Sequence, residues 1–349
     1  MLTTFGESHG PATGGVLDGF PSRVPIDPAF IRAEINRRNP ANYPFSTSRK
    51  EEDEIEILSG LFEGLTTGAP IAFIIRNKDQ RPEDYARLRD LYRPSHADYT
   101  YEKKYGIRDF RGGGRSSART TVAVVAGGAF AKSFLAPEGI RVSGFVSQIG
   151  PYRMKDDLTF TETSAALHSP LACPDDNLTA EMLVFLEKVR ADGDTAGGVV
   201  TCRITGVPPG IGEPLFDKLQ SDLAKSVMSI PAVKGFETGS GFAAAAMTGS
   251  RHNDRFISSG DSIKTESNFS GGIQGGISNG MDIVFRTAFK PVSSIGREQT
   301  TVDREGHEIT YEGKGRHDVC VVPRAVPIVE AMAALVIADH LLRNRATHP

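Results

Sequence analysis

Residues 6–10 read GESHG, which holds a hydroxyl and an imidazole between two glycines. The pattern fits the G-x-S-x-G nucleophile elbow of serine hydrolases, which needs a buried strand before it and a helix after it. Only five residues precede the motif, and Pro11 and Gly14 disfavour a following helix, so the hydrolase context fails. Two interpretations remain: a glycine-flanked turn with a solvated histidine, or a site where small neighbours let a substrate approach Ser8 and His9.

Residues 111–119 read RGGGRSSAR and lead into an apolar stretch of small residues. Three glycines permit unusual backbone angles and let an anion approach closely. Serines can cap the helix that we expect to follow, and a helix N-terminus favours negative charge. The segment is neither a Walker A motif nor a dinucleotide fingerprint, because it lacks GK[ST] and follows no strand. With Arg115 and Arg119 at helical spacing beside it, it indicates an anion-binding site; the alternative is a flexible RGG-type RNA-binding segment.

Three further segments carry groups that could do chemistry. His96 lies in the loop RPSHADYTY; histidine exchanges protons near neutral pH, although a lone loop histidine is more often solvated. Residues 270–280, SGGIQGGISNG, are rich enough in glycine to wrap a flat ligand or a phosphate. A mobile loop that binds no ligand is an equally good interpretation of this composition. Arg316 and Asp318 could contact a ligand or form a structural ion pair.

The composition favours a small anionic ligand over a polyanion. The 40 basic and 43 acidic residues give a net charge of −3, which argues against a nucleic-acid or membrane-surface protein that works by bulk charge. Arginine outnumbers lysine about two to one, and more than half of the arginines lie in the first 119 residues. Arginine offers a planar fork of donors that suits phosphate and carboxylate, whereas lysine is a point charge.

The three cysteines lie far apart and form no CxxC pair, so we expect neither a disulfide framework nor a metal site. The N-terminal residues do not resemble a signal peptide. The longest nearly apolar run, residues 122–131, is too short to cross a bilayer. We therefore expect a cytoplasmic protein with no membrane partner.

The elements that must position these segments mix helices and strands without alternating as βαβ units. Capping residues and apolar periodicity predict helices after Asp27 and over 117–135, 179–191, 215–228 and 325–343. Strands are predicted over 141–149, 198–206 and 281–289, with a strand, turn and strand within 55–76. Residues 77–109 are interpreted as mostly loop and as a plausible lid. No Pro/Ser-rich linker divides the chain, so we predict one large α+β domain over 1–349.

Taken together, the segments resemble the chorismate synthase family. The motifs GESHG, HADYTYEKKYG, RGGGRSSAR, SIPAVKGFE, GGIQGGISNG, KPVSS and GRHDVCVVPRAVPIVEAM match in order over nearly the whole chain. The resemblance implies a β-α-β sandwich and a homotetramer. It also implies the 1,4-elimination of phosphate from 5-enolpyruvylshikimate-3-phosphate to give chorismate. Reduced FMN is implied as cofactor, with no net redox change between substrate and product.

Roles for individual residues follow from the same resemblance. His9, with Ser8 beside it in the catalytic set, matches the histidine that protonates the departing phosphate. His96 matches the histidine that donates to reduced flavin, and Asp318 matches a carboxylate that helps the flavin accept the substrate proton. The candidate contacts to substrate anions are Arg38, Arg49, Arg115, Arg119 and Arg316. The positions associated with FMN are Arg115, Ser116, Ser117, Ala232, Gly275, Lys290, Pro291, Val292, Ser293, Ser294 and Arg316.

Some members of the family carry two arginines linked to NADPH use. Arg38 matches one of them, and Pro44 occupies the position of the other. The sequence leaves open whether NADPH reduces the flavin on this chain or a separate flavin reductase supplies it.

Overall fold

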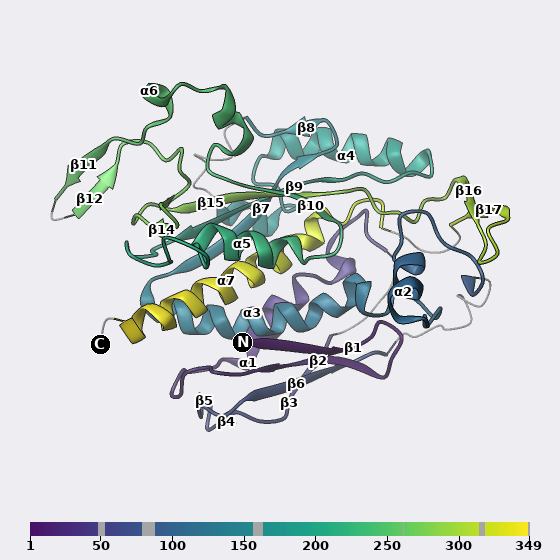
Figure 1. The fold of residues 1–349 in the computed structure, drawn as a ribbon, viewed down its shortest axis with the longest axis horizontal. Helices are drawn as coiled ribbons and strands as arrows, with labels where there is room; N and C mark the ends of the chain where they lie inside the picture. The colour runs from purple at the N-terminus through teal and green to yellow at the C-terminus, as the bar shows by residue number, and fades with distance from the viewer. Residues whose placement is uncertain (48–52, 79–87, 156–162, 261, 314–317, 348–349) are drawn as a thin grey trace.

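The computed structural model describes residues 1–47, 53–78, 88–155, 163–260, 262–313 and 318–347. Two predicted anion contacts, Arg49 and Arg316, lie outside the described residues. The described residues form two main antiparallel sheets with helices between them, so the predicted α+β class and β-α-β layering are confirmed (Figure 1).

The two sheets differ in size and in how deeply they are buried. The smaller has the strand order β1 (Leu2–Gly6), β2 (Ala12–Leu17), β6 (Ile71–Arg76) and β3 (Ile55–Ile57). The larger has the order β10 (Val233–Thr238), β15 (Ile283–Phe289), β9 (Gly198–Thr205), β7 (Arg141–Ile149) and β8 (Tyr152–Arg153). In β6 alternate residues Ile71, Phe73 and Ile75 are fully buried, as expected for a strand with one face on the core. In β15 both faces are largely buried.

Helices α3 (Thr121–Leu135) and α7 (Val322–Thr347) pack against each other between the sheets (Figure 1). Small residues bring their backbones close: a Cβ at Gly128 would lie 2.3 Å from the Cβ of Ala331. Two helical stretches, Ala118–Glu138 and Val322–Thr347, are long and apolar enough to cross a membrane by length and composition. Most of the apolar part of each is buried inside the protein, which is the position of a core helix.

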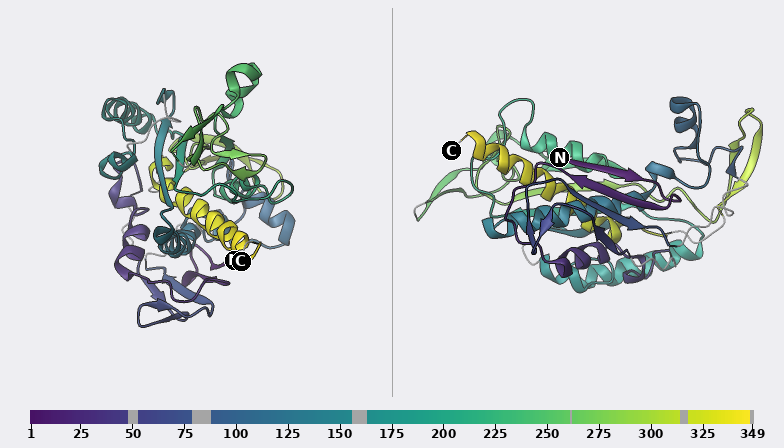
Figure 2. Two further views of the ribbon diagram at one scale, coloured as in Figure 1. Left: turned by 90° about the vertical axis from the view of Figure 1, so that its left-hand side faces the viewer. Right: turned by 90° about the horizontal axis from the view of Figure 1, so that it is seen from below.

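The other elements surround this core. The remaining α-helices are α1 (Pro28–Asn36), α2 (Asp98–Tyr105), α4 (Asp176–Ala191), α5 (Leu219–Met228) and α6 (Gly249–His252). Short hairpins are β4–β5 (Leu61–Phe62, Leu65–Thr66), β11–β12 (Phe256–Ser259, Ser262–Thr265), β13–β14 (Ile273–Gln274, Ile277–Ser278) and β16–β17 (Glu298–Val302, Glu308–Glu312). The 3-10 helices are η1 (Pro40–Asn42), η3 (Gly114–Ser116), η4 (Ala118–Thr120), η5 (Ala136–Glu138), η6 (Thr163–His168) and η7 (Gly241–Ala246). Hairpin β11–β12 projects from one end of the molecule, and α2 with β16–β17 projects from the other (Figure 2).

Four charged side chains, which we call the buried quartet, join α1, α3 and α7 inside the core. The guanidinium of Arg37 donates to both carboxylate oxygens of Glu330 at 2.5 and 2.7 Å and also contacts Glu34. Lys132 donates to Glu34 and Glu330 at 2.5 and 2.6 Å. The backbone amide of Gly144 on β7 donates to Glu330 at 2.8 Å. Every charge in the quartet therefore has an opposite charge within hydrogen-bond distance.

Most predicted elements are confirmed, with ends that move by a few residues. The helix after Asp27 begins as expected, since the Asp27 carboxylate accepts from the amide of Ala29. The interpretation of residues 77–109 as mostly loop is wrong for 98–105, which form α2. That helix shows no apolar face because only Asp98 among its residues is buried. Strands β1 and β2 were not predicted, and for β2 its glycines explain why.

Strand β2 has a sequence, ATGGVL, that disfavours a strand by propensity. Tertiary packing requires its glycines: a Cβ at Gly14 would lie 2.3 Å from the carbonyl oxygen of Phe73 and 2.5 Å from the ring of Phe5. Because β1 and β2 form a hairpin around residues 6–12, a strand rather than a helix follows GESHG. The hydrolase elbow is therefore absent from this turn.

Candidate active site

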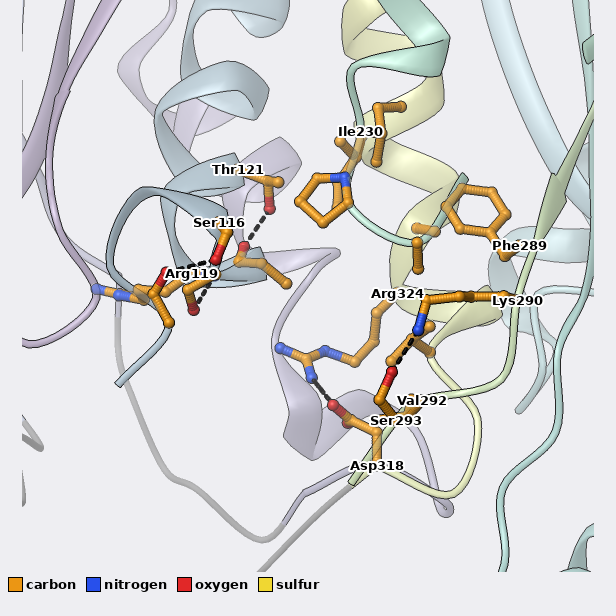
Figure 3. Close-up of a pocket in the computed structure, with 18 of the residues that line it drawn as sticks. Ser116, Arg119, Thr121, Ile230, Phe289, Lys290, Val292, Ser293, Asp318 and Arg324 are labelled. Carbon is orange, nitrogen blue, oxygen red and sulfur yellow. Dashed lines mark hydrogen bonds and ion pairs between the residues drawn. The ribbon is translucent and has the colours of Figure 1, made fainter. Parts of the chain in front are cut away.

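A cavity of about 530 Å³ opens between the beginnings of α3 and α7 and the end of β15 (Figure 3). Its volume falls within the range of small-molecule and cofactor sites. The predicted residues that line it are Arg38, His96, Ser116, Ser117, Arg119, Ala232, Lys290, Pro291, Val292, Ser293 and Asp318. The predicted residues that do not line it, among those described, are Ser8, His9, Arg115, Gly275 and Ser294. The sequence motifs thus converge on one cavity from segments nearly 300 residues apart.

The cavity combines an excess of cations with an apolar wall. Its five cationic lining side chains, among the described residues, are Arg38, Arg93, Arg119, Lys290 and Arg324, against two carboxylates, Asp53 and Asp318. The apolar part of the lining is Ile230, Pro231, Phe289, Val321, Ala325 and Ile328. Such a lining suits a ligand that carries several negative charges and a flat apolar part.

Arg38 and Arg119 share one carboxylate on one side of the cavity. Arg38 Nη1 lies 2.8 Å from an oxygen of Asp53, and Arg119 Nη1 contacts the other oxygen. Arg119 Nε donates to the side-chain oxygen of Asn77 at 2.9 Å. The Asn77 amide in turn donates to the carbonyl oxygens of Glu7 and Gly10, which ties the arginine pair to the GESHG turn. Both guanidiniums are thus held on the same carboxylate at the wall of the cavity.

The RGGGRSSAR segment is folded against the core, which contradicts the interpretation as a flexible segment. It forms two successive 3-10 turns, η3 and η4, before α3 begins at Thr121. The Ser117 hydroxyl caps η4 by accepting from the amide of Arg119. Because the stretch is not α-helical, the helical spacing of Arg115 and Arg119 does not bring the two side chains together.

Arg115 turns away from the cavity toward the edge of the smaller sheet. Its guanidinium donates to the carbonyl oxygen of Gly6 at 2.9 Å and to the hydroxyl of Thr4 at 2.6 Å. Arg115 therefore joins the glycine-rich segment to β1 and does not line the cavity.

His9 lies directly behind the glycine-rich segment, at the edge of the cavity. The hydroxyl of Ser8 lies 3.1 Å from Nδ1 of His9. Gly112 has φ +133°, and a Cβ there would lie 2.3 Å from the same Nδ1. The position after Gly112, Gly113, lines the cavity. Gly112 thus makes room for the imidazole one residue before the cavity lining at Gly113.

His96 has both ring nitrogens engaged. Nδ1 lies 2.9 Å from the carbonyl oxygen of Pro94, and Nε2 lies 3.1 Å from the hydroxyl of Ser294. Because a carbonyl only accepts, Nδ1 carries the proton, and Nε2 accepts from Ser294 when the ring is neutral. Burial and the charge of Arg93 lower the pKa of His96 below its ordinary value. The neutral imidazole is therefore favoured near pH 7.

A buried carboxylate holds the loop that carries His96. Asp98 accepts from the amide of Arg93 at 3.0 Å and from its guanidinium at 2.8 Å, and Arg108 lies 2.9 Å from the same carboxylate. Burial alone would raise the pKa of Asp98, but the hydrogen bonds and charge of Arg93, together with Arg108, hold it below its ordinary value. This ion cluster fixes the backbone on both sides of His96.

Two further loops close the cavity (Figure 3). Lys290 at the end of β15 contacts the hydroxyl of Ser293, and that hydroxyl lies 3.2 Å from the carbonyl oxygen of Ser95 in the His96 loop. Burial, with the charge of Lys234, lowers the pKa of Lys290. On the same side of the cavity in Figure 3, the carboxylate of Asp318 accepts from the amide of Thr47 at 2.9 Å.

Sequence reasoning missed two cationic lining residues, Arg93 and Arg324. Arg93 begins the segment around His96, and Arg324 lies inside the motif GRHDVCVVPRAVPIVEAM, so both were within quoted motifs. The available signal for Arg324 was a cation immediately before the predicted helix 325–343, at an end where the helix dipole disfavours positive charge; in the structure it lies in the first turn of α7. Gly275, in contrast, lies in the turn between β13 and β14 and is not part of the cavity.

Comparison with known proteins gives one consistent result. The family model described as chorismate synthase matches residues 1–342. A chorismate synthase from Cytophaga hutchinsonii is 55% identical over 346 residues, which cover 99% of this chain and 96% of that protein. The chorismate synthase of Christiangramia forsetii is 53% identical over the same length, with the same coverage. A crystal structure of chorismate synthase superposes with a TM-score of 0.79 at 33% identity and covers 99% of this chain and 92% of its own. The chain therefore belongs to the chorismate synthase family.

Proposed function

We propose that the cavity is where this chain converts 5-enolpyruvylshikimate-3-phosphate to chorismate and phosphate by 1,4-elimination, with reduced FMN as cofactor. The observation that carries the proposal is that the described lining residues include five cationic side chains against two carboxylates, with His96 among them. The substrate carries a phosphate and two carboxylates. An enclosed cationic site strengthens each contact with these groups, because the surroundings screen charge less than water does.

The residues present fit FMN as well. The hydroxyl of Ser117, which accepts from the amide of Arg119 and keeps its own proton, and the amine of Lys290 are donors suited to a phosphate. The apolar wall that includes Ile230 and Phe289 suits a flat ring system. When bound, reduced flavin supplies electron density that assists loss of phosphate and takes it back as the proton leaves.

His96 is proposed to hold the proton that stabilises the anionic cofactor. The neutral ring accepts at Nε2 from Ser294, so it donates from that atom only after gaining a second proton. A dianionic or trianionic ligand beside the ring raises the imidazole pKa, because an opposite charge within a few ångströms favours the charged form. Ligand binding and protonation of His96 are therefore coupled.

Asp318 and His9 are proposed to handle the two leaving groups. The Asp318 carboxylate lines the cavity and is proposed to assist removal of the ring proton. His9 lies behind Gly112 and is proposed to protonate the departing phosphate. Arg38 and Arg119 are proposed to bind substrate anions. The cationic lining also displaces water from these anions and orients them.

The test is anaerobic turnover. The full-length protein is incubated with the substrate and chemically reduced FMN, and chorismate and inorganic phosphate are measured. Equal amounts of the two products are expected. A protein that binds flavin but forms no chorismate would contradict the proposal.

The oligomeric state, the location in the cell and the source of electrons for FMN are proposals as well. We propose a homotetramer in the cytoplasm, measured as the mass of the protein in solution and by fractionation of cells. Turnover with NADPH and oxidised FMN, without an added reductase, tests whether Arg38 serves NADPH on this chain. No turnover under those conditions would assign the reduction to a separate flavin reductase.

A further inference from the structure

Arg324 occupies a position where helix electrostatics disfavour it. Helix α7 begins at Val322, and its first turn contains no acidic residue. The N-terminus of a helix carries partial positive charge, so a cation there is unfavourable unless something outside the helix compensates it. Asp318, four residues before the helix, supplies that compensation.

The contact with Asp318 uses only part of the guanidinium. Arg324 Nη1 donates to both carboxylate oxygens at 2.8 and 2.9 Å, and Nε lies 3.2 Å from the carbonyl oxygen of Arg38. Within the described part of the chain, Nη2 makes no hydrogen bond. Figure 3 shows one terminal nitrogen directed at Asp318 and the other directed into the open part of the cavity, on the side of Ser116.

A two-pronged arginine–carboxylate pair normally uses two nitrogens for two oxygens, which satisfies the whole fork. Here one nitrogen takes both oxygens, so the second stays available to a ligand. The two side chains are 15% and 17% exposed, enough to meet a ligand but buried enough for the hydrogen bonds to be strong.

We infer that Arg324 is a substrate-binding residue that also positions Asp318: Nη2 binds an anionic oxygen of the substrate while Nη1 orients the carboxylate. The inference rests on the proposed function, since it assigns one anion contact and one positioning contact within that reaction. It links substrate binding to Asp318 through one rigid planar group. A substrate anion on Nη2 fixes the plane of the guanidinium, and that plane sets the direction of the carboxylate.

Substitution of Arg324 separates the two contacts in steady-state kinetics. Arg324→Gln is expected to raise KM for the substrate at least ~10-fold, because a charge-assisted hydrogen bond is lost, and to lower kcat because Asp318 loses its orientation. Arg324→Lys keeps the charge without the fork, so it is expected to recover part of KM and little of kcat. Oxidised FMN titrated into each variant, followed by its fluorescence, is expected to bind as in the wild type, which also verifies folding.

A double-mutant cycle with Asp318→Asn tests the positioning role. If Arg324 acts on kcat through Asp318, the double variant has the kcat of Asp318→Asn alone, whereas the rise in KM from Arg324→Gln persists. Additive losses in kcat would overturn the positioning role. An unchanged KM in Arg324→Gln, or a loss of flavin binding in place of substrate binding, would overturn the assigned contact.

The same helix offers a matched control. Arg343, near the other end of α7, pairs with Asp217 at 2.8 Å on the surface, away from the cavity. Arg343→Gln is expected to leave both constants within about twofold, as for an exposed ion pair. Absence of turnover in the wild type would contradict the proposed function itself, whereas normal turnover in the wild type and in Arg324→Gln alike would contradict only this inference.

Discussion

The buried quartet and the cavity use the same residue types for opposite purposes. In the quartet two carboxylates, Glu34 and Glu330, meet two cations, Arg37 and Lys132, and each charge is paired. In the cavity five cationic side chains meet two carboxylates among the described lining residues. Arg37 and Arg38 are neighbours in sequence, yet one belongs to the quartet and the other lines the cavity. Charge balance within a cluster, rather than arginine content, separates a structural site from a binding site.

The balance has physical consequences for each region. A buried charge costs several kcal/mol unless it is paired, so the quartet is stable only as a complete set. A cavity with surplus positive charge can lower that cost by taking an anion from solution. The two regions should therefore respond differently to substitution, to acid and to anions.

The largest effect is expected from breaking the quartet. Glu330→Gln leaves Arg37 and Lys132 buried with one carboxylate between them, which costs about 3–5 kcal/mol of unfolding free energy. Equilibrium denaturation by urea at pH 7 measures it. The control is Arg190→Gln, which breaks an exposed pair with Glu187 and is expected to change stability by less than ~1 kcal/mol. Equal effects of the two substitutions would refute the structural role of the quartet.

Acid should remove the stabilisation that ionised Glu330 gives the wild type. Burial would raise the pKa of Glu330, but the charges of Arg37 and Lys132 and their hydrogen bonds lower it to about 2. A carboxyl whose pKa falls on folding stabilises the protein above its unfolded pKa, near 4.5, and loses that contribution as pH falls toward 2. The loss is on the order of 3 kcal/mol. Unfolding free energies measured between pH 5 and 2 should therefore fall less steeply in Glu330→Gln, and parallel curves would contradict the shift.

Removal of the histidines tests the cavity by turnover instead of stability. His96→Ala and His9→Ala are each expected to lower kcat at least ~10²-fold, the usual contribution of a general acid or base. Unfolding by urea should change little, since neither imidazole belongs to the quartet. A near-normal rate in either variant would remove its assigned role, and a large loss of stability would make it structural.

The sequence predicts the core better than the site because the two depend on different information. Apolar periodicity identified α3, α4, α5 and α7 to within a few residues, because one buried face repeats along each helix. Strand β2 was not predicted because its glycines are required by contacts with Phe5 across the hairpin and with Phe73, which is distant in sequence.

The directions in which the side chains of the site point could not be predicted from the sequence. Arg115 and Arg119 are four residues apart, but 3-10 turns rotate successive residues differently from an α-helix, so one reaches β1 and the other lines the cavity. Family motifs located the cavity, whereas the pairing of Arg38 and Arg119 with Asp53, and of Arg324 with Asp318, needed the three-dimensional arrangement.

The smallest expected effect is stabilisation by inorganic phosphate, which should act on the cavity and not on the quartet. Inorganic phosphate should stabilise the wild type through the surplus charge of the cavity, by about 1.4 kcal/mol at ten times its dissociation constant. Arg119→Gln removes one of the two guanidiniums that share Asp53, so its stabilisation by phosphate should largely vanish. Glu330→Gln, although much less stable, should gain as much from phosphate as the wild type, because the quartet has no surplus charge to offer. Thermal unfolding with phosphate, against chloride at equal ionic strength, measures each gain. If Glu330→Gln lost the phosphate effect while Arg119→Gln kept it, charge balance would not distinguish the two regions.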